Sequence, residues 1–124
     1  MKSDQWRVLV IEDESDSTEV VREMFEYNGI KSWAAATAEE ALRMIPEVKP
    51  NLFVVDLALP GMDGWGFLKA VRENPATAEV PAVAFTAYHS INVARQAIEA
   101  GFAAYFPKPL DTTSFVRELA RILE

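Results

Sequence analysis

Residues 52–64 read LFVVDLALPGMDG. The unbroken run of apolar residues at its start is typical of a strand that is buried on both faces of a sheet. The run ends at Asp56, and the residues that follow include Pro60, Gly61 and Gly64, which are typical of a turn. A carboxylate at the end of a buried strand lies where open α/β sheets bind their ligands. We therefore expect Asp56 to belong to a functional site.

Three other apolar runs are also followed by polar side chains. Residues 8–11 precede Glu12, Asp13 and Glu14; residues 82–85 precede Thr86; and residues 103–106 precede a segment that contains Lys108. The carboxyl ends of parallel strands meet at one edge of a sheet, so these side chains are expected to lie together. Carboxylates, a hydroxyl and a lysine are groups that bind a divalent cation and a phosphoryl group. Glu14 has the simpler expected role of capping the helix that follows.

The segments between the apolar runs have apolar residues at helical spacing. Helices are expected at residues 15–27, at residues 64–73 and at about residues 91–100. A further helix is expected to begin at Thr37 and to end within Pro46 to Pro50, and the last helix is expected to follow Asp111, which can cap it. A weaker strand is expected at residues 31–35. Five strand–helix units predict a doubly wound α/β fold, with five parallel strands and five helices on the two faces of the sheet, because a barrel needs eight.

The last two helices have distinct expected faces. The residues expected to be buried are Ile91, Ala94 and Ile98 in the fourth helix, and Phe115, Val116, Leu119, Ile122 and Leu123 in the fifth. His89, the single histidine, falls in the loop after Thr86 and is expected to be a solvated loop residue.

Composition narrows the classes of protein. The chain has 124 residues, which predicts a single domain covering residues 1–124. Its net charge of −7 opposes direct binding to nucleic acid or to anionic lipid. The absence of cysteine excludes disulfides and thiolate metal sites and fits a reducing compartment, so a cytoplasmic location is expected. No apolar stretch approaches the roughly 20 residues that span a bilayer, so no membrane association is expected.

Taken together, the polar residues resemble those of the response-regulator receiver domain of two-component signalling, and the resemblance covers the whole chain. The matching positions are Glu12-Asp13 for the acidic pair, Asp56 with residues 59–64 for the phosphoacceptor loop, Thr86-Ala87 for the hydroxyl switch, Tyr105 for the aromatic switch and Lys108-Pro109 for the basic dipeptide. The resemblance implies a flavodoxin-like sheet with strand order 2-1-3-4-5 and a cis peptide bond between Lys108 and Pro109.

The resemblance also implies a magnesium site. Asp13, Asp56 and the backbone carbonyl of Ala58 would hold Mg²⁺, and Glu12 would act mostly through water. The residues themselves support a cation, because packing three carboxylates into one cleft without a positive ion raises at least one pKa and costs stability.

The implied function is a phosphorylation-controlled switch. A sensor histidine kinase, a histidine phosphotransfer protein or a small phosphodonor would phosphorylate Asp56, with Lys108 and Thr86 contacting the transferred oxygens. Thr86 and Tyr105 would then repack the face formed by the fourth helix, the fifth strand and the fifth helix, which would bind a downstream protein or a second receiver. Such a domain assists its own phosphorylation without being a multiple-turnover enzyme.

Two other classes share parts of this pattern. A haloacid-dehalogenase-like phosphohydrolase also uses an aspartate and magnesium, but its second aspartate, two residues after the first, is replaced here by Ala58. A flavodoxin-like flavin carrier would need a first loop that cradles a phosphate, and the acidic residues 12–14 would repel one.

The residues Ala58 and Tyr88 also predict a long-lived phosphorylated state, because neither side chain is suited to orient an attacking water.

Overall fold

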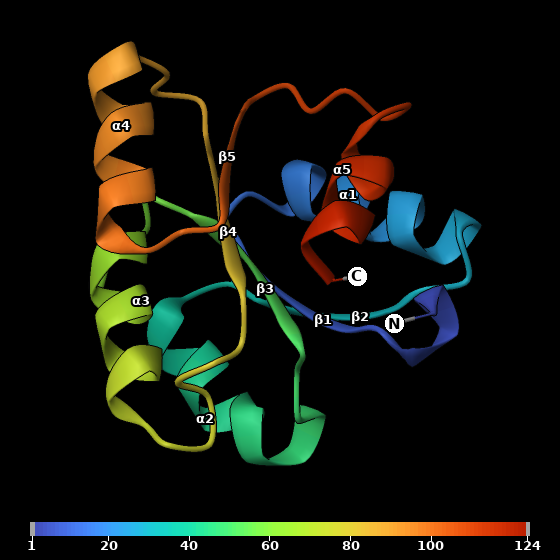
Figure 1. Cartoon of the computed structure of the whole chain (residues 1–124), viewed down its shortest axis with the longest axis horizontal. Helices are drawn as coiled ribbons and strands as arrows, with labels where there is room; N and C mark the ends of the chain where they lie inside the picture. Colours follow the sequence, from blue (N-terminus) through green and yellow to red (C-terminus); the bar gives the residue numbers. More distant parts are fainter. Residues whose placement is uncertain (1, 124) are drawn as a thin grey trace.

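The computed structural model describes residues 2–123, which form one parallel sheet flanked by helices (Figure 1). The strands are β1 (Arg7–Ile11), β2 (Lys31–Ala35), β3 (Leu52–Asp56), β4 (Ala82–Thr86) and β5 (Ala104–Pro107). Their order in the sheet is β2-β1-β3-β4-β5. The predicted doubly wound fold and its strand order are therefore confirmed. The central strand is β3, which pairs with β1 on one side and with β4 on the other.

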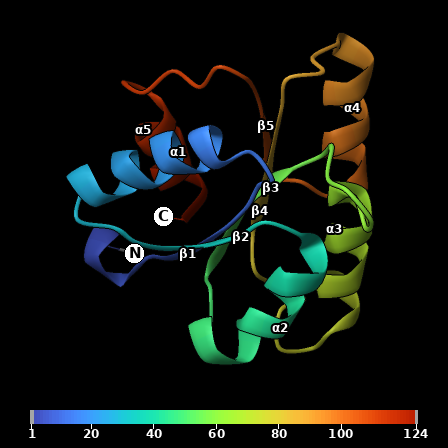
Figure 2. The ribbon, with the colours of Figure 1, turned by 180° about the vertical axis from the view of Figure 1, so that it is seen from behind.

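Helices cover both faces of the sheet. They are α1 (Ser15–Tyr27), α2 (Ala38–Val48), α3 (Gly64–Glu73), α4 (Ile91–Ala100) and α5 (Phe115–Leu123), and a short 3-10 helix at Ser3–Gln5 precedes β1. Two views from opposite sides place α1 and α5 against one face and α2, α3 and α4 against the other (Figures 1 and 2). No helix within residues 2–123 combines the length and the apolar character needed to cross a membrane.

Burial on both faces explains the unbroken apolar run of β3. Phe53 and Val55 pack in the core beneath α2, α3 and α4, whereas Leu52 and Val54 pack in the core beneath α1 and α5. Successive side chains of a strand point to opposite faces, so a strand covered on both sides needs apolar residues at every position. All five residues of β3, Asp56 included, are buried.

Side-chain caps fix the beginnings of three helices. The side chains of Thr37, Asp63 and Ser90 accept hydrogen bonds from backbone N–H groups in the first turns of α2, α3 and α4, respectively. Asp111 caps the turn that leads into α5, where its carboxylate accepts the N–H of Thr113 at 2.9 Å. The helix itself begins four residues later, at Phe115.

The second helix ends within the predicted range of Pro46 to Pro50. The helix α2 continues through Pro46 to Val48 and ends where Lys49 adopts a left-handed φ of 51°. The N–H of Lys49 donates to the carbonyl of Ile45 at 2.8 Å, so the last turn is closed despite the proline. A proline removes one hydrogen bond of the helix. This loss is tolerated in α2 because the apolar face, which includes Ile45 and Val48, is buried against the sheet.

The predicted buried face of the fourth helix is wrong. Ile91 is 75% exposed and Ile98 is 52% exposed, whereas Ala97 is fully buried. Ala94 is half-buried, and Val93 packs against the core together with Ala97. Apolar residues occur all around α4, so their spacing fits two different faces. The face with the small Ala97 packs inward, and the isoleucines remain on the surface. The buried face of α5 was predicted correctly, with Phe115 and Leu119 in the core.

Candidate functional site

Three acidic residues converge at the carboxyl edge of the sheet. Asp56 is the last residue of β3 and is 4% exposed, while Glu12 and Asp13 follow β1 directly. Because β1 pairs with β3, with Ile11 opposite Val55, these strand ends lie side by side. Carboxylate oxygens of Glu12, Asp13 and Asp56 all lie within 4.8 Å of one another. The structure thus brings together the three carboxylates that the sequence singled out.

Lys108 connects this acidic cluster to the other half of the sheet. Its Nζ donates to Glu12 Oε1 and to Asp56 Oδ2, the latter at 3.1 Å. The backbone N–H of Lys108 donates to the carbonyl of Thr86 at 3.0 Å, which fixes the lysine beside β4. The Lys108-Pro109 peptide bond is cis, as the resemblance implied. Glu14 is the N-cap residue of α1, but its side chain makes no capping hydrogen bond and lies 3.5 Å from Lys108 Nζ.

The pKa values of Glu12 and Lys108 are both raised, for different reasons. Burial raises the pKa of Glu12, and the neighbouring Asp56 raises it further, although the hydrogen bond from Lys108 opposes them. Burial by itself lowers the pKa of Lys108, but its contacts with Glu12 and Asp56 outweigh this and favour the ammonium form. The cluster therefore keeps the positive charge of Lys108, while Glu12 resists ionisation.

The acidic cluster fits a hard divalent cation. Oε2 of Glu12 is buried and has no hydrogen-bond partner among residues 2–123. Asp13 is exposed, which leaves one side of the cluster open to an entering ion. Such a cation would satisfy the orphaned oxygen and reduce the repulsion between the carboxylates, and oxygen ligands of this kind suit Mg²⁺.

The loop after Asp56 is held close to the site by its backbone. The N–H of Ala58 donates to Asp56 Oδ1 at 3.0 Å, so Ala58 lies next to the carboxylate. The N–H of Gly64 donates to the carbonyl of Leu57 at 3.2 Å and closes the loop. Glu39 of α2 accepts the N–H of Met62 at 3.2 Å and ties the loop to a neighbouring helix. The proposed role of the Ala58 carbonyl as a metal ligand stays a prediction.

Thr86 and Tyr105 occupy the strand ends on the other side of Asp56. Thr86 ends β4 and is 1% exposed, and its hydroxyl accepts the N–H of Tyr88 at 3.1 Å. Tyr105 is half-buried on β5, where it pairs with Ala84 of β4. Burial raises the pKa of the Tyr105 hydroxyl. Their roles as switch residues stay predictions at this point.

One contact of Tyr105 was missed by the sequence analysis. Its hydroxyl lies 2.9 Å from Nδ1 of His89, and the two rings stack with their centroids 5.5 Å apart. His89 is exposed, as expected, but it is not merely a solvated loop residue. The two residues are 16 positions apart, and only the pairing of β4 with β5 brings them together. No local sequence pattern indicates such a contact.

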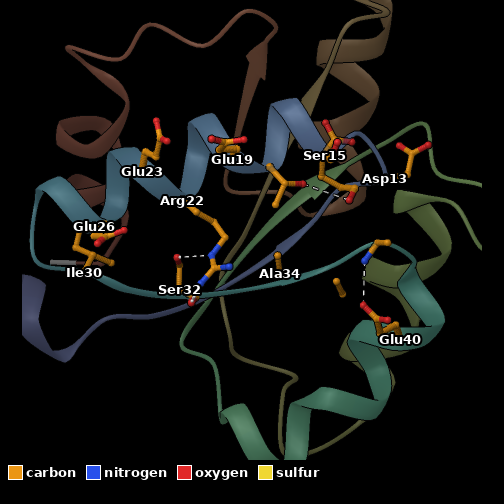
Figure 3. Close-up of a pocket in the computed structure, with 14 residues that line it drawn as sticks. Asp13, Ser15, Glu19, Arg22, Glu23, Glu26, Ile30, Ser32, Ala34 and Glu40 are labelled. Atoms are coloured by element: carbon orange, nitrogen blue, oxygen red, sulfur yellow. Dashed lines mark hydrogen bonds between the residues drawn. The ribbon is translucent and has the colours of Figure 1, made fainter.

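A groove of about 690 Å³ leads away from the acidic cluster between α1 and β2 (Figure 3). The acidic residues that line it are Glu12, Asp13, Glu19, Glu23, Glu26 and Glu40. Arg22 reaches across from α1 and donates to the backbone carbonyl of Ser32 at 3.1 Å. The small side chains of Ser32 and Ala34 leave the space open. An acidic lining next to the site raises the local concentration of cations.

Comparison of the sequence with known proteins identifies a family and several relatives. Residues 8–120 match the family model described as the response regulator receiver domain. The chain is 36% identical to an uncharacterized 14.6 kDa protein of Leptolyngbya boryana, over 91% of this chain and 86% of that protein. It is 28% identical to the sporulation initiation phosphotransferase F of Bacillus subtilis, over 85% of this chain and 83% of that protein.

Solved structures show the same fold. The structure matches the crystal structure of a candidate response regulator from Chloroflexus aurantiacus with a TM-score of 0.88 and 31% identity, over 96% of this chain and 98% of that chain. The chain spans about half the length of the phosphate regulon transcriptional regulators to which it is also similar. An acidic pocket formed by Glu12, Asp13 and Asp56 is typical of phospho-accepting response regulators. The chain belongs to the response regulator receiver domain family of two-component signal transduction.

Proposed function

We propose that this chain is a phosphorylation-controlled signalling switch that accepts one phosphoryl group on Asp56 in the presence of magnesium. The observation that carries the proposal is the position of Asp56, which ends the central strand with Lys108 Nζ at 3.1 Å and two further carboxylates within 4.8 Å. Receiver domains of this family generally act as phosphoacceptors rather than as enzymes. Residues 1–124 would act as one such domain.

In the transfer step, Asp56, Lys108 and Thr86 would each have a definite role. One carboxylate oxygen of Asp56 forms a bond to phosphorus, the bond from phosphorus to the donor breaks, and the donor's electron pair leaves with it. From a phosphohistidine the leaving group is the imidazole, and the product on Asp56 is an acyl phosphate. Lys108 contacts the carboxylate before transfer and is placed to contact the phosphoryl oxygens afterwards. The hydroxyl of Thr86 offers a hydrogen-bond donor to another of these oxygens.

Magnesium would be held by Asp13, Asp56 and the carbonyl of Ala58, with Glu12 acting through water, and would offset negative charge on the transferring group. The orphaned Oε2 of Glu12 supports such a site. Lys108 supplies the fixed positive charge that keeps Glu12 and Asp56 together before an ion binds. Metal binding and phosphorylation would therefore be linked through the same carboxylates.

The signal would leave the site through Thr86 and Tyr105. Thr86 moves toward the phosphoryl group, Tyr105 turns inward, and the face formed by α4, β5 and α5 changes shape. Exposed apolar side chains support partner binding on this side: Tyr88 and Ile91 are each 75% exposed and Ile98 is 52% exposed. The partners would be a sensor histidine kinase or histidine phosphotransfer protein upstream, and a downstream protein or a second receiver at this face. The net charge of −7 argues against direct DNA binding, and the absence of cysteine fits a cytoplasmic signalling protein.

Labelling with acetyl phosphate tests the proposal. With magnesium present, mass spectrometry should find one added phosphoryl group per chain, and Asp56→Asn should add none. Asp63→Asn is the matched control, because Asp63 lies in the same loop but caps α3, a role that asparagine also fills. This control should label like the parent. Full labelling of Asp56→Asn, or continuous turnover of acetyl phosphate without a stable labelled protein, contradicts the proposal.

A further inference from the structure

The loop between β4 and α4 is fastened at both of its ends. At one end the hydroxyl of Thr86 accepts the N–H of Tyr88 at 3.1 Å. At the other end Ser90 caps α4 by accepting the N–H of Val93 at 3.0 Å. Between them His89 extends from the loop to the strand β5, where Nδ1 lies 2.9 Å from the hydroxyl of Tyr105. The loop therefore contacts both residues to which the switch is assigned.

The tautomer of His89 decides the direction of its hydrogen bond with Tyr105. The Tyr105 O–H group donates to Nδ1 when the ring proton of His89 is on Nε2. The two rings also stack, with centroids 5.5 Å apart and planes inclined by 30°. Tyr105 is thus attached to the loop that leads into α4 by one stacking contact and one hydrogen bond.

We propose that His89 is a positioning residue that holds Tyr105 in the arrangement of the unphosphorylated protein. This inference rests on the proposed function, because it takes Thr86 and Tyr105 as the switch. Movement of Thr86 toward a phosphoryl group gives up its hydrogen bond to Tyr88 and loosens the loop that carries His89. Tyr105 turns inward only when its hydroxyl leaves His89. The contact therefore favours the resting state, and its loss favours the active one.

Binding of beryllofluoride, a mimic of the acyl phosphate, measures this balance. His89→Phe keeps a flat ring for stacking but has no Nδ1, so the energy of that hydrogen bond no longer opposes the active state. A net hydrogen bond of ordinary strength predicts that His89→Phe binds beryllofluoride about 2- to 12-fold more tightly than the parent in the presence of magnesium. Titration by amide NMR gives the affinity. Tyr27→Phe, at a position that is 92% exposed at the end of α1, is the control and should bind like the parent.

A double-mutant cycle with Tyr105→Phe separates this role from a general structural one. His89→Phe should gain little affinity in the Tyr105→Phe background, because the hydroxyl is already absent. Without beryllofluoride, the ring signals of Tyr105 in His89→Phe should shift toward their positions in the parent's complex. An unchanged affinity in His89→Phe, an equal gain in both backgrounds, or unshifted ring signals would overturn the role of His89. A parent protein that does not bind beryllofluoride at all would instead overturn the proposed function.

Discussion

Replacing Gly64 with alanine should both destabilise the protein and impair its site, because α3 begins directly against the backbone of Asp56. A Cβ atom at Gly64 would lie 2.6 Å from the carbonyl oxygen of Asp56 and 2.8 Å from the Cα of Leu57. Real Cβ contacts are essentially never shorter than 3.0 Å, so α3 and the end of β3 must separate by several tenths of an ångström. Both obstructing atoms belong to the backbone, so no side-chain rotation relieves the contact.

Overpacking of a tight core position costs about 1–3 kcal/mol, and we expect Gly64→Ala to lower the free energy of unfolding by this amount. The displacement acts on Asp56, the proposed phosphoacceptor, so labelling by acetyl phosphate should also slow. Gly66→Ala is the matched control in the same helix. Its Cβ would meet the flexible side chain of Met62 at 3.0 Å, and alanine is the better helix former by about 0.5–1 kcal/mol.

Urea unfolding and the rate of acetyl phosphate labelling, measured side by side, test this reasoning. Gly64→Ala should be less stable than the parent and slower to label. Gly66→Ala should lose no more than about 0.5 kcal/mol of the free energy of unfolding and should label at the parent's rate. A Gly64→Ala protein with the parent's stability and the parent's labelling rate would refute the inference that α3 packs on the backbone of Asp56.

Three further predictions concern the metal, the lifetime and the pH response. Magnesium at about 100 times its dissociation constant should stabilise the parent by about 2.7 kcal/mol in urea unfolding, and Asp13→Asn should lose most of this gain because one ligand is removed. An Ala58→Asn, Tyr88→Glu double variant should lose its phosphoryl group faster than the parent, since it gains side chains that can orient water; an equal rate counts against this explanation. Burial raises the pKa of Tyr105 above its ordinary value of 10.0, so its contribution to stability should be complete below about pH 10 and should be lost as the pH rises through the raised value. Unfolding at alkaline pH should show a smaller loss for Tyr105→Phe than for the parent.

The strands and the acidic cluster were predictable because one physical cause determines both. A strand that is covered on both faces must be apolar throughout, so β1, β3 and β4 are visible as continuous runs. The first polar residue after such a run marks the edge of the sheet, which is where Asp56 and Glu12 lie. The number of strand–helix units then fixes the class of fold. The family resemblance added the strand order.

The features that were not predictable depend on contacts between distant segments. The end of α2 was predicted only to within Pro46 to Pro50, and the helix continues past Pro46 to Val48 because its burial outweighs the loss of one hydrogen bond. The orientation of α4 depends on which of its apolar residues face the sheet, and these are Val93 and Ala97 rather than Ile91 and Ile98. The contact between His89 and Tyr105 joins the loop after β4 to the strand β5. Hydrophobic spacing along one segment contains none of this information.

Chemical trapping shows directly whether Asp56 is the residue that accepts the phosphoryl group. Borohydride reduces an acyl phosphate to an alcohol, so an aspartyl phosphate becomes homoserine, which mass spectrometry of peptides can locate. After treatment with acetyl phosphate and magnesium, we expect homoserine at position 56 and unmodified aspartate at Asp13 and Asp63. Homoserine at either of those two positions, or phosphorylated protein in which Asp56 remains unmodified by borohydride, would show that Asp56 is not the phosphoacceptor.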